Sequence, residues 1–264
     1  MAKLKGPLAF TGKLQGLSAF TREGTNGVIL RPRYGPSKTD IETKPAFANT
    51  RKNNKEFGGR STVSKCIRDG YHTLKPISDA TNLSRLNKLL KTIQEMDTLN
   101  EYGKRSVALS LKGELLEGFP LNQFHPFESV LQNPVEYSMS RDKLMAVVTL
   151  PALLPGVNFI PPTSHPYFRI AATLNIVPDF YYHQVKYRPK VSYESIHPQL
   201  VNSEWMAAHT RTDAVTLQLN MPVPPPNEEF SLVLTLGIEM GTATSTTHIQ
   251  TVKYAGSGKI LAVR

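Results

Sequence analysis

The chain has 264 residues, of which 40% are hydrophobic, and a formal net charge of +10 at pH 7. Twenty prolines argue against an all-helical fold, and the sequence has no run of about eighteen apolar residues that would predict a membrane-spanning helix. The single cysteine, Cys66, excludes an intrachain disulfide. Residues 1–7 lack the apolar core of a signal peptide, so we expect a cytoplasmic protein or a subunit of an assembled particle.

The positive charge is concentrated at the N-terminal end of the chain. Residues 1–80 contain fifteen Lys or Arg and six Asp or Glu, whereas residues 131–264 contain ten and nine. A localised positive field attracts phosphates or an acidic protein surface. The first third of the chain is therefore the expected site of contact with such a partner.

Residues 1–36 have the pattern of a glycine-rich β-hairpin arm. Asn26-Gly27 lies between two apolar runs, and this pair favours a tight turn because both turn residues need a positive φ. A hairpin alone is only marginally stable in water. We therefore expect the arm to dock on the C-terminal half of its own chain or on a neighbouring subunit.

Residues 37–118 are predicted to form a short helical segment. Pro45 suits the first turn of a helix, and Gly58-Gly59 is expected to end it. A second helix is predicted from Ser61 to Pro76 and a third from Asp79 to Met96, because their apolar residues recur every three or four positions.

Several short stretches of the first hundred residues resemble the opening of a family of uncharacterised bacterial proteins. These stretches are Gly12, Leu17, 28–31, 35–38, 49–51, Asn53, Asn54 and 56–59. No activity is known for that family. The resemblance therefore implies neither a site nor a role for any residue of this chain.

Residues 127–264 alternate between apolar and polar side chains, as antiparallel strands do. In residues 230–240, for example, every second residue is large and apolar. We predict an Ig-like β-sandwich, which makes the whole chain an α+β protein. The expected strands are 127–131, 135–139, 144–150, 168–177, 181–187, 215–221, 230–240, 248–254 and 259–263, with a hairpin turn at 256–258.

No catalytic, cofactor-binding or metal-binding residue is predicted. The seven histidines do not occur at metal-ligand spacing, and no cysteine cluster accompanies them. Cys66 lies on the apolar stripe of the second predicted helix, which favours core packing over a nucleophilic role. The sequence therefore does not indicate an enzyme.

Two sets of residues are candidate contact sites. Basic residues in the first third of the chain could bind phosphates, contact another subunit or simply face solvent. Four aromatic residues are candidates for stacking on a sugar, although the sequence favours aromatic packing at strand ends over this role. The basic set is Arg31, Arg33, Arg51, Lys52, Lys55, Arg60, Lys65 and Arg68, and the aromatic set is Tyr167, Tyr181, Tyr182 and Trp205.

Three functional hypotheses follow from these patterns. The favoured one is a non-enzymatic structural protein: a self-associating subunit of a shell, fibre or filament, such as a phage-derived one. Its homo-oligomeric contacts would be made by the N-terminal arm or by strand exchange. The first alternative is a nucleic-acid-associated protein that binds phosphates through residues 1–80. The second alternative is a carbohydrate-binding module or an enzyme built on the sandwich loops.

Overall fold

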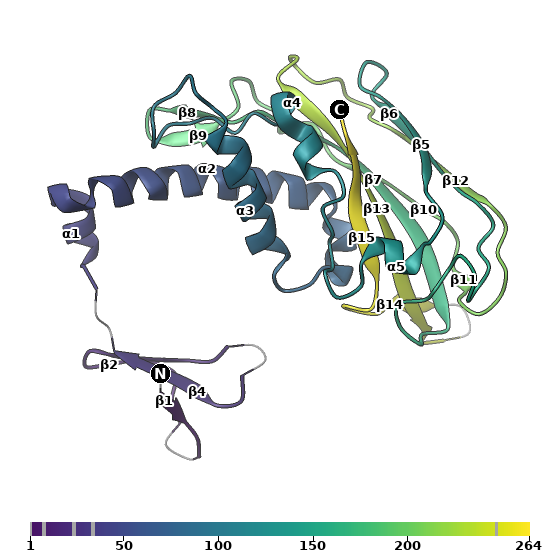
Figure 1. The fold of residues 1–264 in the computed structure, drawn as a ribbon, viewed down its shortest axis with the longest axis horizontal. Coiled ribbons are helices and arrows are strands. Elements are labelled where there is room, and N and C mark those ends of the chain that lie inside the picture. The colour runs from purple at the N-terminus through teal and green to yellow at the C-terminus, as the bar shows by residue number, and fades with distance from the viewer. Residues whose placement is uncertain (1, 7–8, 23–24, 33–34, 246–247) are drawn as a thin grey trace. The chain divides into compact units, whose positions relative to one another are not determined.

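The computed structural model describes residues 2–6, 9–22, 25–32, 35–245 and 248–264 (Figure 1). The chain divides into two compact units, Met1–Arg51 and Lys52–Arg264. Helices and several antiparallel sheets occur together, which confirms the predicted α+β class. Among the residues described, no helix combines the length and the apolar character needed to cross a bilayer.

The N-terminal unit contains a four-stranded antiparallel sheet, so the prediction of a single hairpin arm is not confirmed. Its strands are β1 (Ala2–Leu4), β2 (Gly12–Leu14), β3 (Leu17–Phe20) and β4 (Val28–Pro32), in the order β1-β4-β3-β2.

The tight turn of this sheet lies at a different place from the predicted one. Leu14 pairs with Leu17, and the two residues between them, Gln15 and Gly16, both have a positive φ. Gly27 instead begins the approach to β4, where a Cβ would lie 3.1 Å from the Leu4 carbonyl oxygen. Strands β3 and β4 do form an antiparallel hairpin whose connection contains Asn26-Gly27. They pair only from Phe20 and Ile29, so the tight two-residue turn predicted at Asn26-Gly27 is wrong.

A short helix follows the sheet. In α1 (Lys38–Thr43), the Ser37 side chain accepts a hydrogen bond from the Asp40 amide, and the Asp40 carboxylate accepts one from the Ser37 amide. This reciprocal pair is a capping box, which satisfies amides at the helix start. Arg51 donates to the carbonyl oxygens of Ile41 and Lys44, at 2.7 and 2.9 Å.

Helix α2 (Ala48–Gly70) runs without interruption through Gly58-Gly59, so the predicted helix end at that pair is wrong. It follows the 3₁₀ turn η1 (Pro45–Phe47). A Cβ on Gly59 would lie 2.7 Å from the Tyr187 ring, and one on Gly70 would lie 2.3 Å from the Asn175 side chain. These glycines let the helix pack closely against other parts of the chain, which outweighs their poor helix propensity.

The third predicted helix is confirmed as α3 (Asn82–Glu95). The remaining helices of the second unit are short. They are η2 (His72–Ile77), α4 (Leu109–Lys112), η3 (Gly113–Leu116) and α5 (Phe127–Val130). The strand predicted at 127–131 is wrong, since the Leu131 amide donates to the Phe127 carbonyl in a helical turn. A short apolar run does not by itself distinguish a strand from a helical turn.

The largest sheet is built on two long antiparallel strands, β7 (Tyr167–Pro178) and β13 (Phe230–Ala243). Shorter strands pair with them: β10 (Gln199–Asn202), β11 (Met206–Ala207), β14 (Ile249–Thr251) and β15 (Ser257–Val263). Both β14 and β15 pair with β13, at different parts of its length. Residues 256–258 therefore lead into β15, and the hairpin predicted there is wrong.

Two smaller sheets complete the second unit. A three-stranded sheet has the order β12 (Val215–Asn220), β6 (Met145–Leu150) and β5 (Glu136–Ser140). A hairpin of β8 (Tyr181–His183) and β9 (Lys186–Arg188) replaces the single strand predicted at 181–187. Gln184, in the turn between them, has a φ of 55°.

The largest sheet separates two hydrophobic cores. One core lies between this sheet and the three-stranded sheet, and the other lies between it and helices α2 and α3 (Figure 1). Consequently β7 and β13 are buried on both faces over most of their length. Two sheets do face each other, but the Ig-like form of the sandwich is not confirmed because helices cover the outer face of the larger sheet.

Candidate functional site

The structure does not bring the four predicted stacking residues together. Tyr167 begins β7, whereas Tyr181 and Tyr182 follow its other end, roughly 35 Å away along an extended strand. The Trp205 ring lies 4.7 Å from the Arg169 guanidinium and close to the backbone of Gly241. Trp205 is therefore packed between neighbouring groups of its own chain.

Four of the predicted basic residues have intramolecular partners. Arg60 is 8% exposed and donates to the Gln94 side chain at 2.7 Å. Arg31 lies over the Phe20 ring at 5.4 Å, and Arg51 caps carbonyl oxygens as described above. Arg68 is half-buried beside Tyr71. These contacts give the four residues structural roles, while Arg33 lies outside the described residues.

The three predicted lysines are exposed on α2. Lys52 lies over the Tyr102 ring at 5.8 Å. Lys55 and Lys65 belong to the stripe of α2 that forms one wall of a groove of about 1200 Å³. The structure therefore brings two of the eight predicted basic residues to a common hollow in the surface of the second unit.

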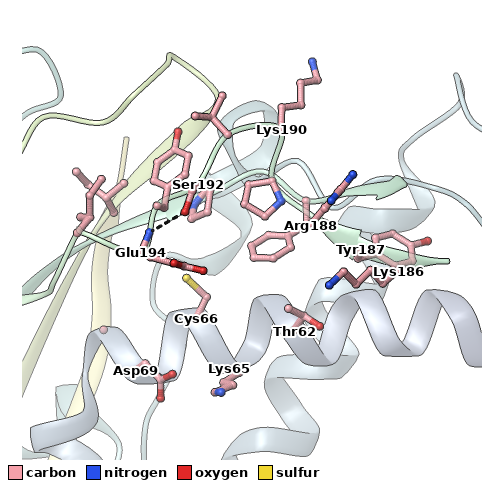
Figure 2. Close-up of a pocket in the computed structure, with 18 of the residues that line it drawn as sticks. Thr62, Lys65, Cys66, Asp69, Lys186, Tyr187, Arg188, Lys190, Ser192 and Glu194 are labelled. Atoms are coloured by element: carbon pink, nitrogen blue, oxygen red, sulfur yellow. Dashed lines mark hydrogen bonds between the residues drawn. The ribbon is translucent and has the colours of Figure 1, made fainter. Parts of the chain in front are cut away.

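The opposite wall of this groove is formed by residues 178–198 (Figure 2). It includes the β8–β9 hairpin and contributes Lys186, Arg188 and Lys190. Asn175 and Ile176 of β7 also line the groove. The sequence-based prediction missed these three cations. They occupy every second position, which is the pattern of side chains on one exposed face of a strand.

Tyr187 fixes the hairpin against the helices. Its ring lies on Gly59 of α2, and its hydroxyl donates to the Arg105 carbonyl at 3.0 Å and accepts from the Gln94 side chain at 3.3 Å. Burial raises the pKa of Tyr187, so the hydroxyl stays protonated at neutral pH. The ring of Tyr182 contacts that of Tyr187 edge-on, with centroids 5.4 Å apart.

The charges of the groove are distributed unevenly along its length. Figure 2 shows Lys186 extending toward Thr62 of α2, while Glu194 lies at the other end, beside Cys66. Within the described part of the chain, no carboxylate pairs with Lys55, Lys65, Lys186 or Arg188. Lys190 is neutralised by Glu229, and Asp69 by Lys75 at 3.3 Å. The hairpin end of the groove is therefore positive.

Cys66 does not have the environment of a nucleophile. Its thiol points into the groove (Figure 2), but burial raises its pKa to about 12, with a smaller contribution from Asp69. At neutral pH the residue is a thiol, which is a poor nucleophile and a poor metal ligand. In the portion of the chain that is described, no cluster of three or more His, Cys, Asp or Glu could hold a metal ion.

The N-terminal sheet has little core of its own. Among its described residues, the buried apolar side chains are Ala19, Val28 and Ile29. Leu14 is 55% exposed and Phe10 is 37% exposed. Within the stretches of this unit that the structure describes, the two outer strands, β1 and β2, each pair on one side only. This unit therefore presents apolar side chains and two open strand edges.

Comparisons with protein-family models, curated proteins and solved structures found no match to this chain. The resemblance of the first hundred residues to uncharacterised bacterial proteins thus remains a sequence-based prediction.

Proposed function

We propose that the protein is a non-enzymatic, self-associating subunit whose N-terminal unit packs against a second copy of the chain. The observation that supports this proposal most directly is the small core of the N-terminal sheet, with three buried apolar side chains among its described residues. A shell, fibre or filament is a setting that suits such a subunit.

The small size of the N-terminal unit supports this proposal. A sheet is stable when its apolar face packs against another layer. Domains below about 70 to 80 residues rarely obtain enough stability from a single core, and they usually rely on disulfides, metals or oligomerisation. Met1–Arg51 is shorter than that and contains no cysteine. Packing against a second copy of the chain is one source of stability open to a unit of this size.

The open edges of the sheet indicate how two copies would meet. Unpaired amides and carbonyls of an edge strand form a template for another strand. Pairing β1 with β1, or β2 with β2, gives an isologous contact between two copies, and using both edges at once would extend the assembly into a fibre. Phe10 and Leu14, which lie beside and within β2, would be buried in the second arrangement.

Replacing Leu14 with aspartate is expected to reduce the mass of the particle in solution. Light scattering coupled to size-exclusion chromatography should give a multiple of 29.3 kDa for the unmodified chain and a smaller multiple for Leu14→Asp. A carboxylate at the contact would be desolvated without a partner. Leu99→Asp is the matched control, because Leu99 is 95% exposed in the second unit and its replacement should leave the mass unchanged.

Two results would contradict the proposal. One is an unmodified chain that stays monomeric at every concentration measured. The other is an oligomeric mass that is the same for the unmodified protein, for Leu14→Asp and for the protein without residues 1–36.

A further inference from the structure

The hairpin end of the groove carries cations without carboxylate partners, whereas several arginines elsewhere in the second unit are paired with carboxylates. Arg85 pairs with Asp79 at 2.7 Å, Arg105 with Glu56 at 2.7 Å, and Arg141 with Glu228 at 3.0 Å. Arg169 and Arg264 also have carboxylate partners, both at 2.5 Å. Lys55, Lys186 and Arg188 have no carboxylate partner in the described part of the chain and line the same groove, which points to an anionic ligand from outside the chain.

The spacing of these cations suits an extended anion better than a single small one. Lys55 and Lys65 are separated by ten residues of α2, which corresponds to about 15 Å along the helix axis. On the facing wall, Lys186 and Arg188 are two residues apart on β9, about 6.6 Å. Charges spread along both walls would follow the backbone of a chain that carries repeated negative charge.

An aromatic ring lies among these cations. Tyr182 lines the groove, and the Lys55 ammonium lies 5.5 Å from the centroid of its ring. Positive grooves with aromatic side chains bind single-stranded nucleic acids, because the cations contact phosphates and the rings stack on bases. An acidic peptide would use the same cations but has no bases to stack on Tyr182.

We infer that the groove between α2 and residues 178–198 binds single-stranded nucleic acid, with its phosphates along Lys55, Lys186 and Arg188 and a base against Tyr182. This function is independent of the proposed self-association. A groove of about 1200 Å³ has room for a short stretch of strand. Glu194 and Cys66 mark the end of the groove that phosphates would avoid.

The test measures binding of a short fluorescent oligothymidine to the full-length protein by anisotropy, between about 50 and 200 mM salt. The double variant Lys55→Glu/Lys186→Glu changes one cation on each wall and should raise Kd by about tenfold or more. It should also reduce the slope of log affinity against log salt by about one to two. Tyr182→Ala should weaken binding about five-fold or more while leaving the salt slope unchanged, because stacking is not ionic.

Lys88→Glu/Lys112→Glu is the matched control. Both lysines are exposed, lie outside this groove and have no carboxylate partner in the described part of the chain. Like the groove variant, this variant replaces two lysines with two glutamates, so the two variants change the net charge equally. This variant should change Kd less than about twofold. Circular dichroism confirms that both double variants are folded.

Three outcomes would overturn the inference. The first is no binding of the oligonucleotide by the unmodified protein at the lowest salt concentration. The second is an equal loss of affinity in the groove and control variants, which would show binding to net charge alone. The third is displacement of the oligonucleotide by an equimolar polyglutamate of the same charge, together with no effect of Tyr182→Ala, which would assign the groove to acidic peptides.

Discussion

Replacing Glu56 with alanine should lower the free energy of unfolding by about 3 to 5 kcal/mol. The carboxylate is 1% exposed and accepts hydrogen bonds from Arg105, twice at 2.7 Å, and from the Gly103 amide at 2.9 Å. Its loss would leave the buried guanidinium of Arg60, 3.9 Å away, without a facing charge. Urea denaturation followed by circular dichroism measures the change.

The control for this substitution is Glu101→Ala. Glu101 pairs with Lys104 at 2.6 Å, but both side chains are largely exposed, and exposed pairs contribute little to stability. The denaturation midpoint of Glu101→Ala should therefore match that of the unmodified protein. Equal midpoints for Glu56→Ala and Glu101→Ala would show that the buried pair adds no stability.

The Glu56→Gln variant tests how the stability contributed by the Glu56 carboxylate depends on pH. Burial opposes ionisation of Glu56, but the hydrogen bonds from Arg105 and Gly103 outweigh it and hold the pKa below its ordinary value of 4.5. A carboxyl with a lowered folded-state pKa stabilises the fold above its unfolded-state pKa, and this contribution is lost as the pH falls through the folded-state value. The stability difference between the unmodified protein and Glu56→Gln should therefore shrink below pH 4.5, whereas a constant difference would exclude this origin.

Replacing Gly59 with alanine should lower the free energy of unfolding by about 1 to 3 kcal/mol, although alanine is the better helix former. The added Cβ would lie 2.7 Å from the Tyr187 ring, which is itself held by two hydrogen bonds. At the adjacent Gly58 nothing lies within 4 Å of the added Cβ. Gly58→Ala should therefore raise the free energy of unfolding by about 0.5 to 1 kcal/mol.

These two neighbouring substitutions differ in sign because of one distant ring. Adding Tyr187→Ala should remove most of the penalty of Gly59→Ala, which a double-mutant cycle measures as a coupling between the two sites. Stabilisation by alanine at both glycines would contradict the packing of the hairpin on α2.

The sequence pattern of β13 predicted one buried face correctly and missed the second. Phe230, Leu232 and Leu234 point into the core beneath the three-stranded sheet, as the alternation indicated. The intervening residues face the helices, and they include Ser231, Thr235 and Gly237. Small uncharged residues at alternate positions are compatible with burial as well as exposure. Glu239, in the same alternation, indicates solvent from its charge but is buried, because it pairs with Arg169.

The groove could be predicted only in part because its walls come from distant segments. Lys55 and Lys65 follow a recognisable basic run, but the facing cations lie more than a hundred residues further along the chain. What joins them is the contact between Gly59 and Tyr187. From local helix propensity, a glycine pair predicts the end of a helix. Its role in packing depends on a distant residue, Tyr187, which the spacing of apolar residues along the sequence does not identify.

Because β7 and β13 lie between two cores, we expect the second unit to unfold as a whole. Neither the helical layer nor the three-stranded sheet can separate without exposing one face of the same two strands. Their amide hydrogens should therefore exchange with solvent only when the whole unit opens, at the free energy of global unfolding. The unit should melt in one cooperative transition, so a ligand held at the helical edge of the sheet would also slow the opening of the far side.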